Sequence, residues 1–153
     1  MNPAISIRQA TEQDSEIVFN LIFSLLKELF PEDPLYTEDN LKMATEKMLT
    51  HPNYWVLVAY ADEIPVGAVG LNECAAIYAV GCYGEITELY VLPEYRSANV
   101  GAKLIEAALE FGKQKKWSMM EVGAPDQPKW ERTLNFYIKT GFHVVGPRLY
   151  QML

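Results

Sequence analysis

The segment 85–102, EITELYVLPEYRSANVGA, constrains the fold of this chain more than any other part of the sequence. Its apolar and β-branched residues predict a strand, which Pro93 ends. A short loop over 93–99 then leads into a predicted helix over 100–116, and a further strand is predicted over 119–122. A strand, a helix and a second strand in this order imply a parallel crossover, so the chain must contain an α/β unit.

Hydrophobic periodicity and turn residues predict the remaining elements. Apolar residues at helical spacing predict helices over 12–30, 37–49 and 130–139. Apolar runs predict strands over 4–9, 54–61, 66–71, 75–80 and 85–92, followed near the end of the chain by two closing strands over 142–145 and 149–153. The predicted fold is α/β (α+β), with a mixed, mostly antiparallel sheet of six to seven strands flanked by about four helices. No repeat, linker or low-complexity segment interrupts the sequence, so residues 1–153 are expected to form one domain.

Composition excludes several classes of function. Half of the 153 residues are hydrophobic and 22% are charged, as in soluble globular proteins. The net charge of −7 argues against binding of a nucleic-acid backbone. No apolar run approaches the roughly 20 residues of a membrane helix, and the N-terminal residues lack the pattern of a signal peptide. We therefore expect a cytoplasmic protein with neither a membrane nor a nucleic-acid partner.

Cysteine and histidine are too scarce and too scattered to build a metal centre. Cys74 and Cys82 have the spacing of neither a disulfide framework nor a common zinc site. His51 and His143 lie far apart in the sequence and have no cluster of carboxylates around them. We therefore predict no metal and no cysteine–histidine catalysis.

The loop before the predicted helix over 100–116 has the features of an anion site. A helix N-terminus presents unpaired N–H groups and the positive end of a dipole, which suit a pyrophosphate. Gly101 would let a ligand approach the backbone closely, and Arg96 and Lys103 add local positive charge. The same spacing also fits a plain strand–loop–helix crossover without a ligand, so both interpretations stay open on this ground.

Two motifs give the sequence a resemblance to the GNAT superfamily of N-acyltransferases. Residues 96–101, RSANVG, resemble the family's phosphate loop, Gln/Arg-x-x-Gly-x-Gly/Ala, which follows a strand and opens a helix. Residues 135–142, NFYIKTGF, resemble the family's late helix, which ends in Phe-Tyr-x-x-x-Gly-Phe. The resemblance covers about 84–145. Two positions depart from it: Asn99 replaces the first glycine of the loop, and Trp130 replaces an asparagine that in many relatives touches the pantetheine arm.

The resemblance implies an N-acetyltransferase that moves the acetyl group of acetyl-CoA directly to a primary amine of a small molecule or a protein. Backbone groups of Leu89, Tyr90 and Val91 would bind the pantetheine and the thioester, and an N–H near Val91 would stabilise the oxyanion. The rest of the cosubstrate would contact residues of the phosphate loop and the late helix, namely Arg96, Ser97, Ala98, Asn99, Val100, Gly101, Ala102 and Trp130.

The resemblance also implies a general acid and a general base. Tyr137 occupies the position of the tyrosine that protonates the leaving thiolate in the family. Three carboxylates are candidates for the base that deprotonates the amine, with Glu88 and Glu85 favoured equally and Glu121 behind them. Glu85 and Glu88 are three residues apart, so a regular strand would point them to opposite faces.

The acceptor amine is expected at the loop between the first two helices. Phe30, Glu32, Asp33 and Tyr36 place carboxylates beside aromatic rings there, which suits a cationic amine with an apolar portion. A solvated acidic turn is the simpler interpretation of the same residues. The two closing strands at the C-terminal end would support a homodimer.

Two other functions are weighed against the enzyme. A non-catalytic module that binds or senses acyl-CoA could use the same fold, because fold does not fix function, and Asn99 and Trp130 are the residues that favour this alternative. A Rossmann-type nucleotide enzyme is disfavoured, because no G-x-G-x-x-G follows an early strand. Thiol release that depends on an added amine would distinguish the enzyme from the module.

Overall fold

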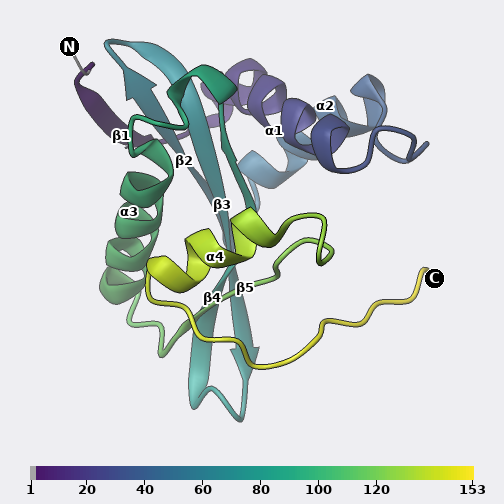
Figure 1. Cartoon of the computed structure of the whole chain (residues 1–153), viewed down its shortest axis with the longest axis vertical. Coiled ribbons are helices and arrows are strands. Elements are labelled where there is room, and N and C mark those ends of the chain that lie inside the picture. Colours follow the sequence, from purple (N-terminus) through teal and green to yellow (C-terminus); the bar gives the residue numbers. More distant parts are fainter. Residues whose placement is uncertain (1–2) are drawn as a thin grey trace. The chain divides into compact units, whose positions relative to one another are not determined.

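The computed structural model of the chain describes residues 3–153 (Figure 1). These residues divide into two units, 3–121 and 122–153, which are treated separately below. In chain order the helices and strands are β1 (Ile5–Gln9), α1 (Ser15–Leu29), α2 (Glu38–Leu49), β2 (Tyr54–Ala61), β3 (Ile64–Ala76), β4 (Gly81–Val91), α3 (Val100–Gln114), β5 (Met120–Val122) and α4 (Glu131–Lys139). Short 3-10 turns, η1 (Glu12–Asp14) and η2 (Pro93–Tyr95), precede α1 and follow β4.

The described residues form one sheet of five strands in the order β1-β2-β3-β4-β5. The first four strands pair antiparallel with their neighbours, and β5 joins β4 after the crossover through α3. The prediction of six to seven strands was therefore wrong, although the α/β class and the four helices are confirmed.

One of the missing strands is explained by the length of β3. The segments predicted over 66–71 and 75–80 are one long strand, β3, which ends at Ala76, and 77–80 form the turn into β4. β4 also begins earlier than the strand predicted over 85–92, and Gly84 lies inside it. The ring of Trp117 occupies the space where a side chain at Gly84 would stand, so this glycine allows close packing rather than a turn.

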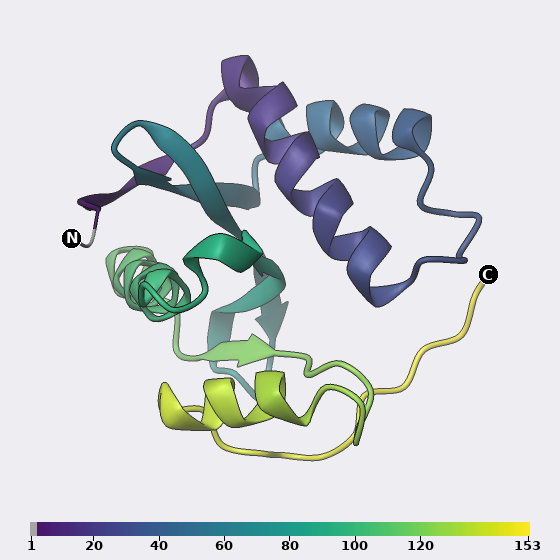
Figure 2. The same ribbon diagram turned by 45° about the horizontal axis from the view of Figure 1, so that its top comes forward.

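The two faces of the sheet carry different helices (Figure 2). One face packs against α1 and α2 through a core cluster that consists of Val18, Leu21, Val56, Val58, Tyr60, Ala68 and Tyr90. On the other face, Gly67 lies against Val100 and Leu104 of α3. Val100, Leu104, Ile105 and Ala108 are buried there, as the periodicity of the predicted helix indicated.

Local capping explains where the first two helices begin. Thr11 and Asp14 form a capping box, in which the Thr11 hydroxyl accepts from Gln13 and the Thr11 N–H donates to the Asp14 carboxylate over 2.8 Å. Thr37 caps α2 by accepting from the N–H of Asn40. Thr11 thus caps η1, and α1 itself begins at Ser15, three residues after the predicted start, whereas the start of α2 agrees with the predicted helix over 37–49. On α2, Ala44 is exposed.

Residues 122–153 contain α4 and the C-terminal segment. The helix ends in a Schellman motif, because Phe142 donates to Tyr137 and Gly141, at φ 108°, donates to Ile138. The end of α4 at Lys139 agrees with the helix predicted over 130–139. The strands predicted over 142–145 and 149–153 are absent from the described residues, where this segment runs on without regular structure. Strand propensity did not suffice here, because a strand forms only when it has a pairing partner.

Residues 3–153 show neither a membrane-spanning helix nor a cluster of metal-binding side chains. None of their helices has both the length and the apolar character that crossing a membrane requires. They contain no group of three or more His, Cys, Asp or Glu side chains that could hold a metal ion.

Candidate active site

A β-bulge in β4 places two candidate bases on the same face of the sheet. Glu85 lies opposite Asn72 and Glu88 lies opposite Gly70, whereas Thr87 is an extra residue that β3 does not match. Since Asn72 and Gly70 are two residues apart on β3, Glu85 and Glu88 point to one face. The expectation from a regular strand, that they point to opposite faces, was wrong because the bulge shifts the alternation by one residue.

Three side chains meet above Gly70, which has no side chain to occupy that space. The hydroxyls of Tyr54 and Thr87 both donate short hydrogen bonds to Oε1 of Glu88, and the two hydroxyl oxygens lie 3.1 Å apart. A Cβ on Gly70 would collide with all three of these groups. The glycine therefore creates the room in which the Glu88 carboxylate is held on a half-buried strand.

The protonation state of Tyr54 fixes the direction of its hydrogen bond. Burial raises the pKa of the Tyr54 hydroxyl far above its usual value, and the negative charge of Glu88 raises this pKa further. Tyr54 thus stays neutral and acts as a donor at any working pH. Both hydroxyls use Oε1, so Oε2 of Glu88 remains outside this pair of bonds and can face a substrate.

Glu121, the third candidate base, has a different environment. It lies on β5, where its Oε1 accepts a 2.9 Å hydrogen bond from the hydroxyl of Tyr78. Tyr78 belongs to the turn between β3 and β4 and is largely exposed. Glu121 is therefore held by an exposed side chain of a turn, whereas Glu88 is held at the bulge.

The loop after β4 has the geometry expected of an anion site. Asn99 adopts a left-handed conformation, with φ 63° and ψ 21°, immediately before α3. Asparagine tolerates this region better than most residues, so the turn forms without the usual glycine. The first intrahelical bond runs from Lys103 to Asn99. The N–H groups of 100–102 precede that bond and are the unpaired donors that a phosphate uses.

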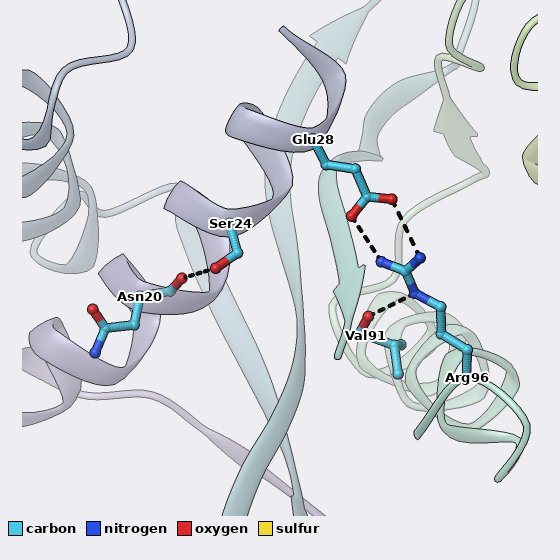
Figure 3. A network of polar contacts seen from close by, with 5 residues as sticks. All are labelled: Asn20, Ser24, Glu28, Val91 and Arg96. Carbon is cyan, nitrogen blue, oxygen red and sulfur yellow. Dashed lines mark hydrogen bonds and ion pairs between the residues drawn. The ribbon is translucent and has the colours of Figure 1, made fainter. Parts of the chain in front are cut away.

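Arg96 makes contacts that its sequence position did not predict. Its Nη2 and Nη1 donate to the two carboxylate oxygens of Glu28 on α1 over 2.9 and 3.2 Å, and its Nε donates to the carbonyl of Val91 over 2.9 Å. Figure 3 shows the guanidinium between these two partners. The hydrogen bond with Glu28 raises the pKa of Arg96 above its usual value. The positive charge expected for the loop is therefore already paired with a carboxylate.

The candidate acid lies in the second unit. Tyr137 on α4 is only 6% exposed, and its ring contacts Phe142 edge-on with centroids 5.8 Å apart. Burial raises the pKa of its hydroxyl to about 12. Trp130, a candidate contact of the pantetheine arm, is half-buried at the start of the same helix.

The loop expected to bind the acceptor is an exposed turn. The rings of Phe30 and Tyr36 lie against each other with centroids 5.6 Å apart. The Asp33 carboxylate accepts a 2.9 Å bond from the N–H of Leu35, so this carboxylate stabilises its own turn. Glu32 is exposed. These contacts hold the loop in shape while leaving its surface open.

Sequence reasoning missed Tyr54, Thr87, Gly70 and Glu28. Only Gly70 carried a local signal, because a glycine inside a strand indicates a bulge or a close approach. The other three act through partners distant in the sequence or through the bulge itself.

Comparison with known proteins identifies the family. The family model of the GNAT acetyltransferase domain matches residues 43–144, which is about two thirds of the chain. The chain belongs to the GNAT acetyltransferase family. It is accordingly an acetyltransferase, and the resemblance seen in the two motifs is confirmed.

Individual relatives agree with this assignment. An uncharacterised N-acetyltransferase of Archaeoglobus fulgidus is 32% identical over 120 residues, which cover 77% of this chain and 80% of the relative. The aminoalkylphosphonate N-acetyltransferase of Salmonella typhimurium is 26% identical over 140 residues, or 92% and 86% of the two chains.

Solved structures share the fold. An aminoglycoside acetyltransferase from an uncultured soil metagenomic sample, in complex with sisomicin, has a TM-score of 0.81 at 23% identity and covers 97% of this chain and 96% of its own. An aminoglycoside N-acetyltransferase in complex with CoA has a TM-score of 0.79 at 19% identity, with coverage of 100% and 97%. GNAT proteins use acetyl-CoA as the acyl donor.

Proposed function

We propose that this chain transfers the acetyl group of acetyl-CoA directly to a primary amine, with Glu88 as the general base and Tyr137 as the general acid. The observation that supports this most strongly is the cluster above Gly70, where two hydroxyls hold the carboxylate of Glu88 by one oxygen. Bound acetyl-CoA would supply an activated thioester. The acceptor would supply the attacking amine, and the proton transfers would depend on side chains of this chain.

The loop after β4 fits the cosubstrate. The N–H groups at the start of α3, the left-handed turn at Asn99 and the adjoining residues of 96–102 suit the pyrophosphate. The end of β4, Leu89 to Val91, offers backbone groups beside this loop for the pantetheine and the carbonyl of the acyl group. A donor near Val91 would stabilise the negative charge that develops on that oxygen.

Proton transfers can be assigned to two side chains. Oε2 of Glu88 takes a proton from the ammonium of the acceptor, so that the amine can attack the thioester carbonyl. Glu85 shares its face and Glu121 lies on the next strand, and we assign the proton to Glu88 because two hydroxyls hold its carboxylate by one oxygen. Tyr137 gives its proton to the departing thiolate and is reprotonated, directly or through solvent, by the proton that the attacking nitrogen loses as the amide forms. Burial raises the pKa of this hydroxyl and keeps it protonated before transfer.

We propose a small-molecule cation with a primary amine as the acceptor. The net charge of −7 would attract such a cation, and Glu85, Glu88 and the loop with Phe30, Glu32, Asp33 and Tyr36 would provide carboxylates and aromatic rings for it. The name of the Salmonella relative also points to a small amine. A protein amine is the alternative. The free cysteines Cys74 and Cys82 suit a reducing compartment, so we place the reaction in the cytoplasm.

We further propose that the protein is a homodimer that associates through residues 142–153. Val145, Leu149 and Tyr150 in this segment are exposed by 94%, 89% and 88%. A soluble chain rarely leaves so many apolar side chains in water without a partner. The segment has the β propensity of a strand and pairs with no strand of its own chain among the described residues. We therefore propose that it pairs with a second copy of the chain.

Calorimetric titration tests the proposed cosubstrate. Acetyl-CoA and CoA should bind at micromolar strength, whereas ATP should not. The enzyme loaded with acetyl-CoA is then screened with primary amines for release of the free thiol. Absence of acetyl-CoA binding, or thiol release at the same rate with and without every amine tested, would contradict the proposal.

A further inference from the structure

Glu28 and Arg96 join two segments that the proposed reaction uses separately. Glu28 lies near the end of α1, two residues before Phe30, where the proposed acceptor loop begins. Arg96 begins the loop that leads to α3. Both oxygens of the Glu28 carboxylate accept from the guanidinium, which is the two-pronged geometry that fixes orientation as well as distance.

The third guanidinium contact ties the same side chain to the end of β4. Nε of Arg96 donates to the carbonyl of Val91 over 2.9 Å, and the guanidinium carbon lies 5.5 Å from the centre of the Tyr90 ring. The backbone N–H of Arg96 donates to Pro93 over 3.3 Å, and that of Ala98 donates to Tyr95. All three nitrogens of the guanidinium are therefore engaged in holding the strand, the loop and α1 together.

An arginine beside an anion site can act in two ways, and the two predict opposite effects of Glu28. If the guanidinium binds the phosphate itself, Glu28 competes with the phosphate and weakens its binding. If the guanidinium holds the loop so that backbone N–H groups point at the phosphate, Glu28 is required for that binding. The bidentate pair, together with the bond to Val91, favours the second way, because it leaves each guanidinium nitrogen with a protein partner.

We propose that Glu28 is a positioning residue for acyl-CoA binding, which acts by holding Arg96 and thereby the loop 96–102 in its binding conformation. This inference rests on the proposed binding of acyl-CoA. It assigns the side chain of Arg96 to the loop and leaves the pyrophosphate to the backbone of the α3 N-terminus. The end of α1 thereby supports the acyl-CoA site through Glu28, without belonging to the loop itself.

The test combines calorimetric CoA affinity with amide hydrogen exchange of the free protein. In Glu28→Gln, CoA affinity should fall by about three- to tenfold, and the hydrogen-bonded amides of Arg96 and Ala98 should exchange faster while those in the buried part of α3 keep their rates. Neutralising a carboxylate should by charge alone strengthen anion binding, so a fall identifies lost positioning. Glu94→Gln is the matched control, because it removes a charge from the same loop without breaking the pair, and its affinity should stay equal or rise slightly.

A double-mutant cycle with Arg96→Gln completes the test. The double variant should bind CoA no more weakly than Arg96→Gln alone, because Glu28 acts through Arg96 and its loss has no further effect once Arg96 is replaced. Tighter or unchanged CoA binding in Glu28→Gln, with unchanged exchange at Arg96 and Ala98, would overturn the inference. Failure of the wild-type chain to bind CoA would instead overturn the proposed function, and with it the role of Glu28 toward acyl-CoA.

Discussion

Gly70 of β3 lies directly opposite Glu88 of β4, at the register shift that Thr87 creates. The absence of a side chain on one strand leaves room for a carboxylate on the other, and the hydroxyl of Tyr54 reaches the same space from β2. The candidate base is thus held by a bulge, a glycine and a tyrosine that come from three adjacent strands.

Replacing this glycine should separate activity from stability. In Gly70→Ala the new methyl group would displace the flexible ends of Glu88 and Tyr54 rather than any backbone. We expect kcat/KM to fall by at least about tenfold, since a displacement on the order of 1 Å can cost about a hundredfold in rate. The free energy of unfolding should change by only about 1 kcal/mol. Steady-state kinetics and urea unfolding measure the two effects, and unchanged kinetics would remove the cluster from the mechanism.

The two tyrosines that donate to candidate bases provide a matched comparison. Tyr54→Phe removes the hydrogen bond to Glu88, so kcat should fall by about five- to fiftyfold, as expected for a base that loses its orientation. Tyr78→Phe removes the equivalent bond to Glu121 and should leave kcat within about twofold. The kcat values of the two variants show whether Glu88 or Glu121 is the general base. A larger loss in Tyr78→Phe would transfer the role of base to Glu121.

Tyr137→Phe should lower kcat by about 10²- to 10⁴-fold, which is the usual contribution of a general acid, with CoA affinity preserved.

The hydroxyl of Tyr137 also affects the stability of the protein at high pH. Burial raises the pKa of this hydroxyl from 10 in the unfolded chain to about 12 in the folded protein. The stability that the neutral, buried hydroxyl contributes is therefore fully present below pH 10 and is lost as the pH rises through 12. Unfolding measured from pH 9 to 12 should show a smaller loss of stability in the variant. A wild-type rate for Tyr137→Phe would exclude it as the acid.

The proposed homodimer depends on apolar residues of the C-terminal segment. Substituting Val145→Asp and Tyr150→Asp together should convert the protein from dimer to monomer, because a charged side chain disrupts an apolar interface. Met43→Asp, at another exposed apolar residue on α2, is the control and should leave the dimer intact. Light scattering after size exclusion measures the mass. A wild-type protein that is monomeric at micromolar concentration would contradict the proposed dimer.

The sequence predicted the elements whose signals are local. Pro93 marked the end of β4, and the helical period of apolar residues marked α3; both agree with the structure. Each signal depends on residues within one or two turns of chain, so no knowledge of tertiary contacts was needed.

Features that depend on partners far along the chain could not be predicted in the same way. The bulge at Thr87 exists only in the register between two strands, so Glu85 and Glu88 were placed on opposite faces. Glu28 and Arg96 are 68 residues apart, and their ion pair leaves no mark on either local pattern. Residues 142–153 show the converse case, in which strand propensity without a partner produced no strand.

The most direct test of the account compares Glu88→Gln with Glu85→Gln in amine-dependent release of thiol from acetyl-CoA. The two carboxylates share a strand and a face, and Tyr54 and Thr87 both donate to Glu88. We expect Glu88→Gln to lose at least about a hundredfold in kcat while CoA affinity is kept, and Glu85→Gln to keep kcat within about threefold of wild type while KM for the amine rises. Equal rates in the two variants, or the larger loss in Glu85→Gln, would contradict the assignment of Glu88 as the base.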